Sequence, residues 1–211
     1  EVLAAPNEDA ATPDATPIDP EKYERVGDMA ALERWIGAIY ERGYVAVDTE
    51  TTGLDEMVVD LVGISLCVEA GEACYIPIIH KEGDADDLFG SDDLAEGQMG
   101  FDECLAMLKP VLEDASVLKI GQNMKYDVKI FANHDITVAP IDDTMLLSYA
   151  QFAGLHNHGM DRLSETYLGH TPIPIKPLLG SGKSAITFDR VSIADAVKYA
   201  AEDADITLRL W

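Results

Sequence analysis

The chain has 211 residues, of which 47% are hydrophobic, and it carries a formal net charge of −24. These values are typical of one globular domain with its own core and exclude a mainly disordered protein. No apolar run approaches the roughly 20 residues of a membrane helix, and 39 acidic against 15 basic residues argue against a free-standing, tight binder of nucleic acid, which needs Lys and Arg to contact phosphates.

Residues 1–22 are rich in Ala, Pro, Asp and Glu without a hydrophobic period. They are predicted to form a flexible linker or arm, and the fold is predicted to begin near Tyr23. No signal segment follows the initial Glu, and no capping signal precedes the end at Trp211. We therefore expect a domain, residues 23–211, excised from a longer protein. Three cysteines without zinc-ligand spacing predict reduced thiols in a cytoplasm.

The first predicted element is a helix that Asp28 caps and that runs to about Arg42, where Gly43 ends it. Three strands are predicted next, Tyr44–Asp48, Val58–Glu69 and Ala73–Ile79, followed by an acidic surface loop over Lys81–Gly100. The rest alternates: helix Phe101–Leu112, strand Val117–Gly121, and helices Met124–Asn133, Asp143–Phe152, Met160–Leu168 and one from Ile193 onward. This order predicts an α/β fold with a mixed sheet flanked by helices.

Asp48 and Glu50 lie two residues apart at the end of the first predicted strand, so both side chains point to one face. Among 39 acidic residues such a pair also arises by chance. Its position favours function, because an unpaired carboxylate closing an apolar run is costly to bury. Ligands also bind at the C-terminal ends of strands in open α/β sheets.

Asn123 and Asp127 lie four residues apart at the start of a helix that follows another buried strand. Asn123 has the alternative role of a helix N-cap. Asp127 has the alternative of a favourable interaction with the helix dipole.

Tyr199 and Asp203 are one turn apart and share a face of the last helix. Glu202, Asp203 and Asp205 alternatively form a solvated stripe, but the apolar positions around them place Asp203 near the buried side. Taken together, the acidic positions predict an oxygen-rich site for Mg²⁺ or Mn²⁺. Two such ions ~3.5–4 Å apart clamp the attacking and leaving oxygens of a phosphodiester, which points to a nuclease.

Asp48-Thr-Glu50, Asn123-x-x-x-Asp127 and Tyr199-x-x-x-Asp203 resemble the three motifs of the DEDD exonuclease superfamily in its tyrosine-containing branch. Longer stretches are similar to the 3′→5′ proofreading domain of bacterial DNA polymerase I: Val47–Asp55, Lys119–Asp127, Asp143–Leu146 and Lys198–Asp205. The resemblance implies an RNase H-like fold, with a 5′-nuclease domain before it and a covalently attached polymerase domain after it.

Residue by residue, the resemblance implies that Asp48, Glu50 and Asp203 hold one divalent ion. Asp48 and Asp127 would hold a second, partly through water, with Mg²⁺ or Mn²⁺ as the expected metals and Zn²⁺ an option at one site. Tyr199 would orient the attacking water.

The implied DNA contacts surround these residues. Leu54 would act as an apolar wedge against the terminal base, and Met160 would lie near the terminal nucleotide. The strand path would be lined by Thr51, Gln122, Asn123 and Tyr126. Two positions depart from the family: Ile175 stands where a stacking aromatic residue is frequent, and Asn157 stands where Arg is familiar. A weaker grip on single strands is therefore expected, with the chemistry retained.

Three other patterns are predicted to be unrelated to the metal chemistry. Gly180–Ser184 lacks the glycine of a phosphate loop at Pro177, so it is predicted to be a flexible loop from which Lys183 meets DNA. The His156 and His158 pair lacks further zinc ligands. The acids of Asp84–Asp93 lack the spacing of a calcium loop and are predicted to be a solvated surface.

The implied reaction releases nucleoside 5′-monophosphates from single-stranded or frayed DNA 3′ ends, carried out by a monomer. The net charge predicts weak DNA binding by the isolated domain. Two alternatives remain open. One is an RNA-trimming exonuclease of the ribonuclease D kind, which shares the metal chemistry. The other is a non-catalytic module that braces a polymerase.

Overall fold

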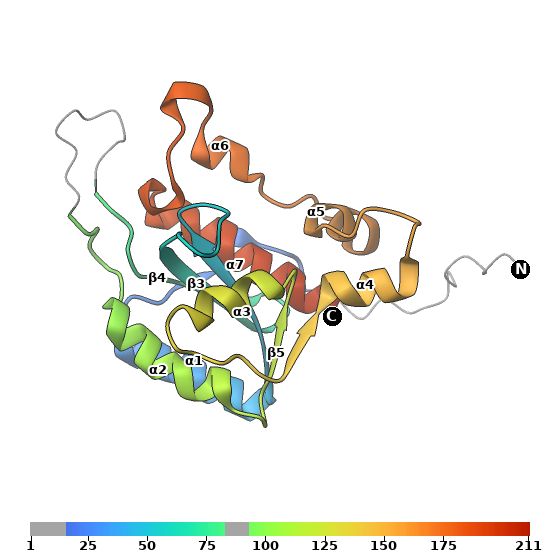
Figure 1. Ribbon diagram of the computed structural model, residues 1–211, viewed down its shortest axis with the longest axis horizontal. Coiled ribbons are helices and arrows are strands. Elements are labelled where there is room, and N and C mark those ends of the chain that lie inside the picture. Colours follow the sequence, from blue (N-terminus) through green and yellow to red (C-terminus); the bar gives the residue numbers. More distant parts are fainter. Residues whose placement is uncertain (1–15, 83–92) are drawn as a thin grey trace, which may run out of the picture.

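The computed structural model describes residues 16–82 and 93–211. Residues 1–15 of the predicted arm and nearly all of the acidic segment Asp84–Asp93 lie outside the described residues. A six-stranded sheet with the order β1-β4-β3-β2-β5-β6 forms the centre of the domain, and helices cover both of its faces (Figure 1). This arrangement confirms the predicted α/β fold with a mixed sheet flanked by helices.

The strands are β1 Glu24–Arg25, β2 Tyr44–Thr51, β3 Leu61–Glu69, β4 Glu72–Pro77, β5 Leu118–Gly121 and β6 Ile141–Asp143. β2, β3 and β4 form an antiparallel meander, whereas β5 and β6 continue the sheet in parallel beside β2, and β1 pairs in parallel with β4. β1 and β6 were not predicted, because strands of two or three residues are too short to show an alternating pattern.

The helices are α1 Met29–Arg42, α2 Phe101–Glu113, α3 Lys125–Ala132, α4 Thr144–Phe152, α5 Met160–Leu163, α6 Ile175–Leu179 and α7 Ile193–Leu210. α1 begins and ends as predicted. The Asp28 side chain accepts a hydrogen bond of 2.9 Å from the backbone N–H of Ala31, and Gly43 ends the helix at a φ of 76°. A π-helical stretch, Ser164–Leu168, continues directly from α5. α6 was not predicted. No helix in the described ranges combines the length and the apolar character needed to cross a bilayer.

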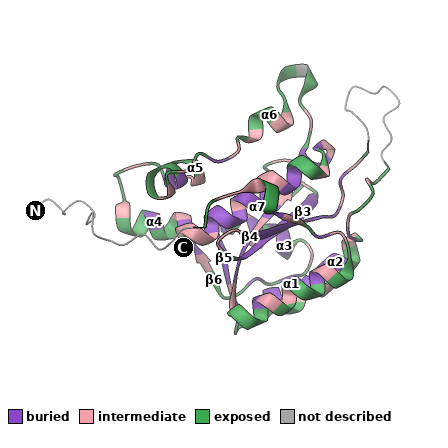
Figure 2. Cartoon of the chain, turned by 180° about the vertical axis from the view of Figure 1, so that it is seen from behind, coloured by how far each residue is buried: buried purple, intermediate pink, exposed green. Residues whose placement is uncertain are grey.

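Alternation along β2 divides the interior into two cores. Val45 and Val47 join the core beneath α1, α2 and α3, whereas Ala46 joins the core beneath α7. Figure 2 shows the buried strands and the inner side of α7 from behind. The buried side of α7 is rich in small residues, namely Ala196, Ala200, Ala201 and Ala204. Small side chains let this helix lie close to the sheet, which brings its polar side chains within reach of β2.

Two acids of α7 are buried, so the alternative of a solvated stripe is wrong for them. Glu202 is 1% exposed and Asp205 is 0% exposed. Asp205 accepts hydrogen bonds from the Tyr23 hydroxyl (2.8 Å), the Gly71 backbone N–H (2.9 Å) and the Arg209 Nε (2.8 Å). A buried carboxylate is tolerated when it is paired and hydrogen-bonded. Asp205 therefore fastens α7 to the start of the domain and to the β3–β4 turn.

The residues just before Tyr23 contact α7 as well. Pro20–Lys22 form a short 3-10 helix, and Glu21 pairs with Lys198. The carbonyl of Thr16 accepts a hydrogen bond of 2.6 Å from Arg209. All three cysteines are buried and free.

Candidate metal centre and substrate groove

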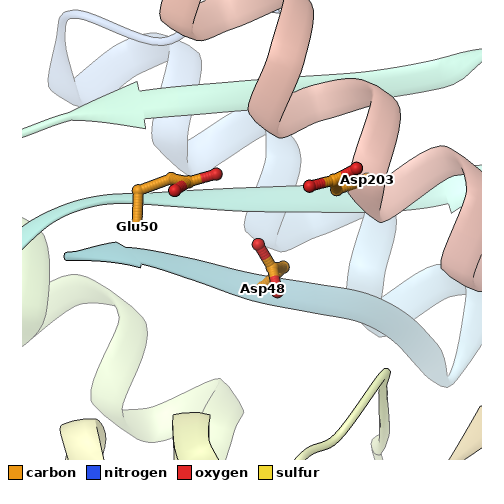
Figure 3. Close-up of side chains that lie close together, drawn as sticks. All are labelled: Asp48, Glu50 and Asp203. Atoms are coloured by element: carbon orange, nitrogen blue, oxygen red, sulfur yellow. The ribbon is translucent and has the colours of Figure 1, made fainter. Parts of the chain in front are cut away.

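Three carboxylates converge between β2 and α7. Asp48 and Glu50 project from the same face of β2, the face that α7 covers, and Asp203 projects from α7 toward them. One oxygen atom of each lies within 4.8 Å of the others. Figure 3 shows the three side chains around one shared space. The period of two in the strand and the packing of the helix therefore bring together three of the four acids that the sequence analysis singled out.

This cluster holds protons unusually tightly in the absence of a cation. Burial, and then the charges of neighbouring acids, raise the pKa of Asp48 and of Glu50 well above their usual values. Burial raises the pKa of Asp203 to about 8, against an opposing hydrogen bond from Tyr199. A divalent cation would reverse these effects, and an all-oxygen donor set suits hard ions such as Mg²⁺ and Mn²⁺. The residues present fit a bound divalent metal.

Asp127 approaches the site from α3. It is 2% exposed, and its Oδ1 accepts hydrogen bonds from the backbone N–H (3.1 Å) and the hydroxyl (2.5 Å) of Thr49. Burial raises the pKa of Asp127 to about 7, although these hydrogen bonds oppose the shift. Its charge is the largest that acts on Asp48. Asp127 thus stands beside the three converging acids but is not part of their compact group.

Tyr199 lies one turn before Asp203 on α7 and is hydrogen-bonded to its carboxylate. Its ring packs against Phe188, with the ring centroids 5.9 Å apart. Burial, followed by the charge of Asp203, raises the pKa of Tyr199 far above its usual range. The hydroxyl therefore keeps its proton at neutral pH and acts as a hydrogen-bond donor at the edge of the acidic group.

A groove of about 440 Å³ opens beside Glu50 and Tyr199. Four of the residues predicted to contact DNA line it, namely Thr51, Leu54, Tyr126 and Ile175. Further lining residues were not predicted, namely Leu179, Ile186, Thr187 and Phe188. These residues lie in a short helix and irregular chain without a hydrophobic period, so the sequence carried no signal for them. Leu54 is 92% exposed.

The Tyr126 hydroxyl shapes the rim of this groove. It donates to the carbonyl of Gly53 at 2.9 Å and lies 2.6 Å from the hydroxyl of Thr51. These contacts hold the turn after β2, and with it Leu54, against α3.

The other residues predicted to lie along the strand path are not in the lining of this groove as far as the chain is described. The Gln122 amide is engaged by protein groups: its Nε2 donates to the His158 carbonyl at 2.9 Å, and its Oε1 accepts from the Thr144 hydroxyl. Met160 is half-buried at the start of α5.

Asn123 occupies a left-handed turn with a φ of 64°. The alternative role as N-cap is wrong, because Met124 holds that position and makes no capping hydrogen bond with its own side chain. The backbone N–H of Asn123 donates instead to Asp143 at 3.1 Å. Asp143 also accepts from Met124 and from two residues of α4, so one carboxylate joins the starts of both helices.

The segment that leads to Ile175 is fastened to α7. Glu202 accepts a hydrogen bond of 2.6 Å from the backbone N–H of Ile173 and lies 2.9 Å from Nε2 of His170. Asn157 is exposed, and its side-chain oxygen accepts from the backbone N–H of Gly159. Lys183 belongs to the 3-10 helix Gly182–Ser184, and its side chain is outside the described part of the structure.

Solved structures establish the class of fold. The chain is similar to Escherichia coli RNase D, with a TM-score of 0.62 and 19% identity over 89% of this chain and 43% of the other. It is also similar to the Aedes aegypti Nibbler EXO domain, with a TM-score of 0.62 and 14% identity over 93% and 88%. A structure of Brucella melitensis NrnC with bound Mg²⁺ gives a TM-score of 0.57 and 23% identity over 82% and 71%. The fold is that of RNase H-like exonucleases.

The family is defined by sequence. Residues 23–211 match the 3′-5′ exonuclease family, and the chain belongs to it. It is 48% identical to DNA polymerase I of Rhizobium leguminosarum over 204 residues, which are 92% of this chain and 20% of that protein. It is 39% identical to DNA polymerase I of Pseudomonas aeruginosa over 98% of this chain and 22% of that protein. The chain thus spans about a fifth of these relatives and is homologous to their exonuclease domain, which confirms the resemblance.

Proposed function

We propose that this chain removes nucleoside 5′-monophosphates from the 3′ ends of single-stranded or frayed DNA, as the proofreading part of a DNA polymerase I. The observation that carries the proposal is that the acidic group adjoins a groove. Glu50 belongs to the compact group with Asp48 and Asp203 and also lines the groove together with Leu54 and Ile175. A strand lying in the groove would present its terminal phosphodiester to the carboxylates.

Asp48, Glu50 and Asp203 would hold one divalent ion, and Asp48 with Asp127 a second. Mg²⁺ and Mn²⁺ suit these oxygen ligands best, and Zn²⁺ is an option at one of the two positions. When bound, such ions neutralise charge that develops on the phosphate and promote ionisation of the attacking water. The Mg²⁺ in the NrnC structure supports this assignment.

The chain's own groups would position the reactants. The Tyr199 hydroxyl, next to Asp203, would orient the attacking water. Leu54, Tyr126 and Ile175 would hold the terminal bases by apolar contact and stacking, which depend on shape and not on base edges. Cleavage is therefore expected to be nearly independent of base identity. Mismatched ends are expected to be preferred, because they unpair at lower cost.

The net charge of −24 is consistent with this role only if another part of the protein attracts DNA. The relatives are about five times longer than this chain. We infer that a covalently attached polymerase domain supplies the basic surface, within a monomeric cytoplasmic protein, and that the isolated domain binds DNA weakly.

The direct test uses a duplex with a mismatched, labelled 3′ end, incubated in Mg²⁺ or Mn²⁺ with the chain or with its Asp48→Ala variant. The chain should shorten the labelled strand, and Asp48→Ala should reduce the rate on the order of a thousandfold or more. Asp102→Ala, which removes an exposed acid on α2, is the matched control and should cleave normally. Equal rates for the chain and for Asp48→Ala would disprove the assignment.

The same assay separates the alternatives. The likeness to RNase D favours comparison with RNA, and faster shortening of an RNA 3′ end would support the RNA-trimming function. A non-catalytic module would show no cleavage and no heat of Mn²⁺ binding.

A further inference from the structure

A buried tyrosine on the same face of the sheet as the acidic group contacts a buried histidine. Tyr75 of β4 and His80 are both fully buried, and the Tyr75 hydroxyl lies 2.9 Å from Nε2 of His80. Nδ1 of His80 lies 2.9 Å from the carbonyl oxygen of Val191, just before α7. The pair therefore links the sheet to the start of the helix that carries Asp203.

The direction of these hydrogen bonds follows from the carbonyl, which can only accept. Nδ1 of His80 must therefore carry the proton and donate to Val191. Burial lowers the pKa of His80 and keeps its ring neutral, so Nε2 is an acceptor. The Tyr75 hydroxyl accordingly donates its proton to His80, and its oxygen retains lone pairs for other contacts.

The register of the sheet brings Tyr75 to the face of the carboxylates. Asp48 pairs with Ser65, and Ser65 pairs with Tyr75, so the three form one row across β2, β3 and β4. Glu50 pairs with Gly63 in the next row. Directly opposite residues of antiparallel strands share a face, with Cβ atoms about 4.5–5.5 Å apart. Tyr75 therefore shares the face of both acids.

Gly63 shows where the hydroxyl lies. A Cβ atom at this position would fall 2.1 Å from the Tyr75 hydroxyl oxygen and 2.3 Å from the adjoining ring carbon. The hydroxyl thus occupies the space that a side chain of residue 63 would fill, directly across from Glu50. Tyr75 can occupy this position only because residue 63 is a glycine. The arrangement places the hydroxyl oxygen of Tyr75 next to the start of the Glu50 side chain.

Ser65 provides a second, independent observation. Its hydroxyl is completely buried between Asp48 and Tyr75 and has no hydrogen-bond partner among the described residues. An unpaired buried hydroxyl costs free energy, so such groups normally have a partner. Its position between Asp48 and Tyr75 leaves the Ser65 hydroxyl available to form a hydrogen bond within the acidic site.

We propose that Tyr75 is a positioning residue for the metal ligands Asp48 and Glu50, held in place by His80, with the Ser65 hydroxyl beside it. This inference rests on the proposed function. The tyrosine fills the space behind Glu50, so that the carboxylate is directed toward α7 before a cation arrives. Groups behind metal ligands typically contribute about 10–100-fold to metal affinity.

The test is a calorimetric titration with Mn²⁺ of the full chain and its variants. Tyr75→Phe keeps the ring and removes the hydroxyl, and His80→Leu removes its acceptor. Each should weaken Mn²⁺ binding about tenfold. Tyr75 and His80 act as one unit. The variant that carries both Tyr75→Phe and His80→Leu should therefore bind Mn²⁺ no more weakly than the single variant with the lower affinity. His80→Gln offers an acceptor again and should recover most of the affinity.

Tyr23→Phe is the matched control. It removes another buried tyrosine hydroxyl on the α7 side of the sheet, one that donates to Asp205, which is outside the group of three converging acids. Its Mn²⁺ affinity should equal that of the unmodified chain. In cleavage assays Tyr75→Phe should lower kcat and leave KM for the oligonucleotide unchanged, because the groove is intact.

Unchanged Mn²⁺ affinity in Tyr75→Phe would overturn the inference, as would an equal loss in Tyr23→Phe, which would indicate general destabilisation. Thermal unfolding of each variant shows whether it is folded. If Tyr75→Phe is not folded, the loss in His80→Leu and its recovery in His80→Gln provide a second route. Absence of Mn²⁺ binding by the unmodified chain would instead overturn the proposed function, and the inference with it.

Discussion

Thr49 donates two hydrogen bonds to a single oxygen of Asp127, from its hydroxyl at 2.5 Å and its backbone N–H at 3.1 Å. Thr49 lies between Asp48 and Glu50 in sequence but on the opposite face of β2, the face of the α3 core. One strand therefore presents two acids to α7 and fastens a third acid from α3.

Thr49→Val tests this fastening. The valine keeps the shape of the side chain and removes the hydroxyl donor. The free energy of unfolding, measured in denaturant, should therefore fall by roughly 1.5–3 kcal/mol, as expected for a hydrogen bond to a charged group. Cleavage should slow while the three converging acids still bind one metal. Thr207→Val is the control, because the buried Thr207 hydroxyl has no partner among the described residues. A comparable loss of stability in Thr207→Val would refute the argument.

Asp203→Asn and Asp205→Asn should have opposite effects on stability. Burial raises the pKa of Asp203 to about 8, so at pH 9, where it is charged, neutralising it should raise the melting temperature of the metal-free chain while cleavage falls on the order of a thousandfold. Asp205 is paired with Arg209, so its neutralisation should destabilise the fold by about 3–5 kcal/mol. Melting curves in a chelator measure the stability of each variant, and initial rates measure cleavage. Melting temperatures that change in the same direction in Asp203→Asn and Asp205→Asn would contradict the electrostatic account.

The metal-free chain should lose stability as the pH rises. In the fold, the pKa is about 8 for Asp203 and about 7 for Asp127, and it is raised for Asp48 and Glu50. Unfolded carboxyls titrate near 4, so the folded state binds more protons between these values. The stabilisation is complete below about pH 4 and is lost as the pH passes 7–8. Melting temperatures in a chelator should be higher at pH 6 than at pH 9, and Mg²⁺ should stabilise more at pH 9.

The groove should bind single strands more tightly after Ile175→Phe. A phenylalanine restores a stacking surface worth about 1–3 kcal/mol per base, which corresponds to at least about fivefold in affinity. Asn157→Arg should add one phosphate contact and steepen the salt dependence by about 0.7 in the logarithmic slope. Fluorescence titration with a labelled oligonucleotide measures both. Leu155→Phe places the same ring on an exposed site outside the groove and should change nothing.

Gly63→Ala tests the close approach of Tyr75 without altering either partner's chemistry. The added methyl would meet the tyrosine hydroxyl at 2.1 Å, so the ring must move, and both the melting temperature and the Mn²⁺ affinity should fall. Gly37→Ala on α1 meets nothing within 4 Å and should stabilise the chain by about 0.5–1 kcal/mol. An unchanged melting temperature and Mn²⁺ affinity in Gly63→Ala would mean that the tyrosine does not occupy this space.

The acidic group was predictable from local rules. Alternation in a strand orients Asp48 and Glu50 together, and helical periodicity turns Asp203 inward with Tyr199. Asp28 and Gly43 likewise carry the local chemistry that begins and ends α1, so that helix was predicted almost to the residue.

The remaining features depend on partners that are distant in the sequence. Asp205 is buried because Tyr23 and Gly71 approach it, and no local pattern distinguishes it from the solvated acids nearby. The contact between Tyr75 and Gly63 depends on strand register. The wall of the groove at Ile186 and Phe188 comes from chain without a period, so only the tertiary fold reveals it.

Adjacent residues of α7 serve two different parts of the domain. Glu202 binds the chain at Ile173, two residues before Ile175, whereas Asp203 belongs to the acidic group. The distance from the chain at Ile173–Ile175 to the carboxylates is therefore set by one rigid helix. Sequence can change within residues 180–185, before the groove-lining Ile186, while the spacing between a strand's bases and its terminal phosphate stays constant. In the proposed nuclease, the outer contacts with the strand can therefore change while the position of cleavage stays the same.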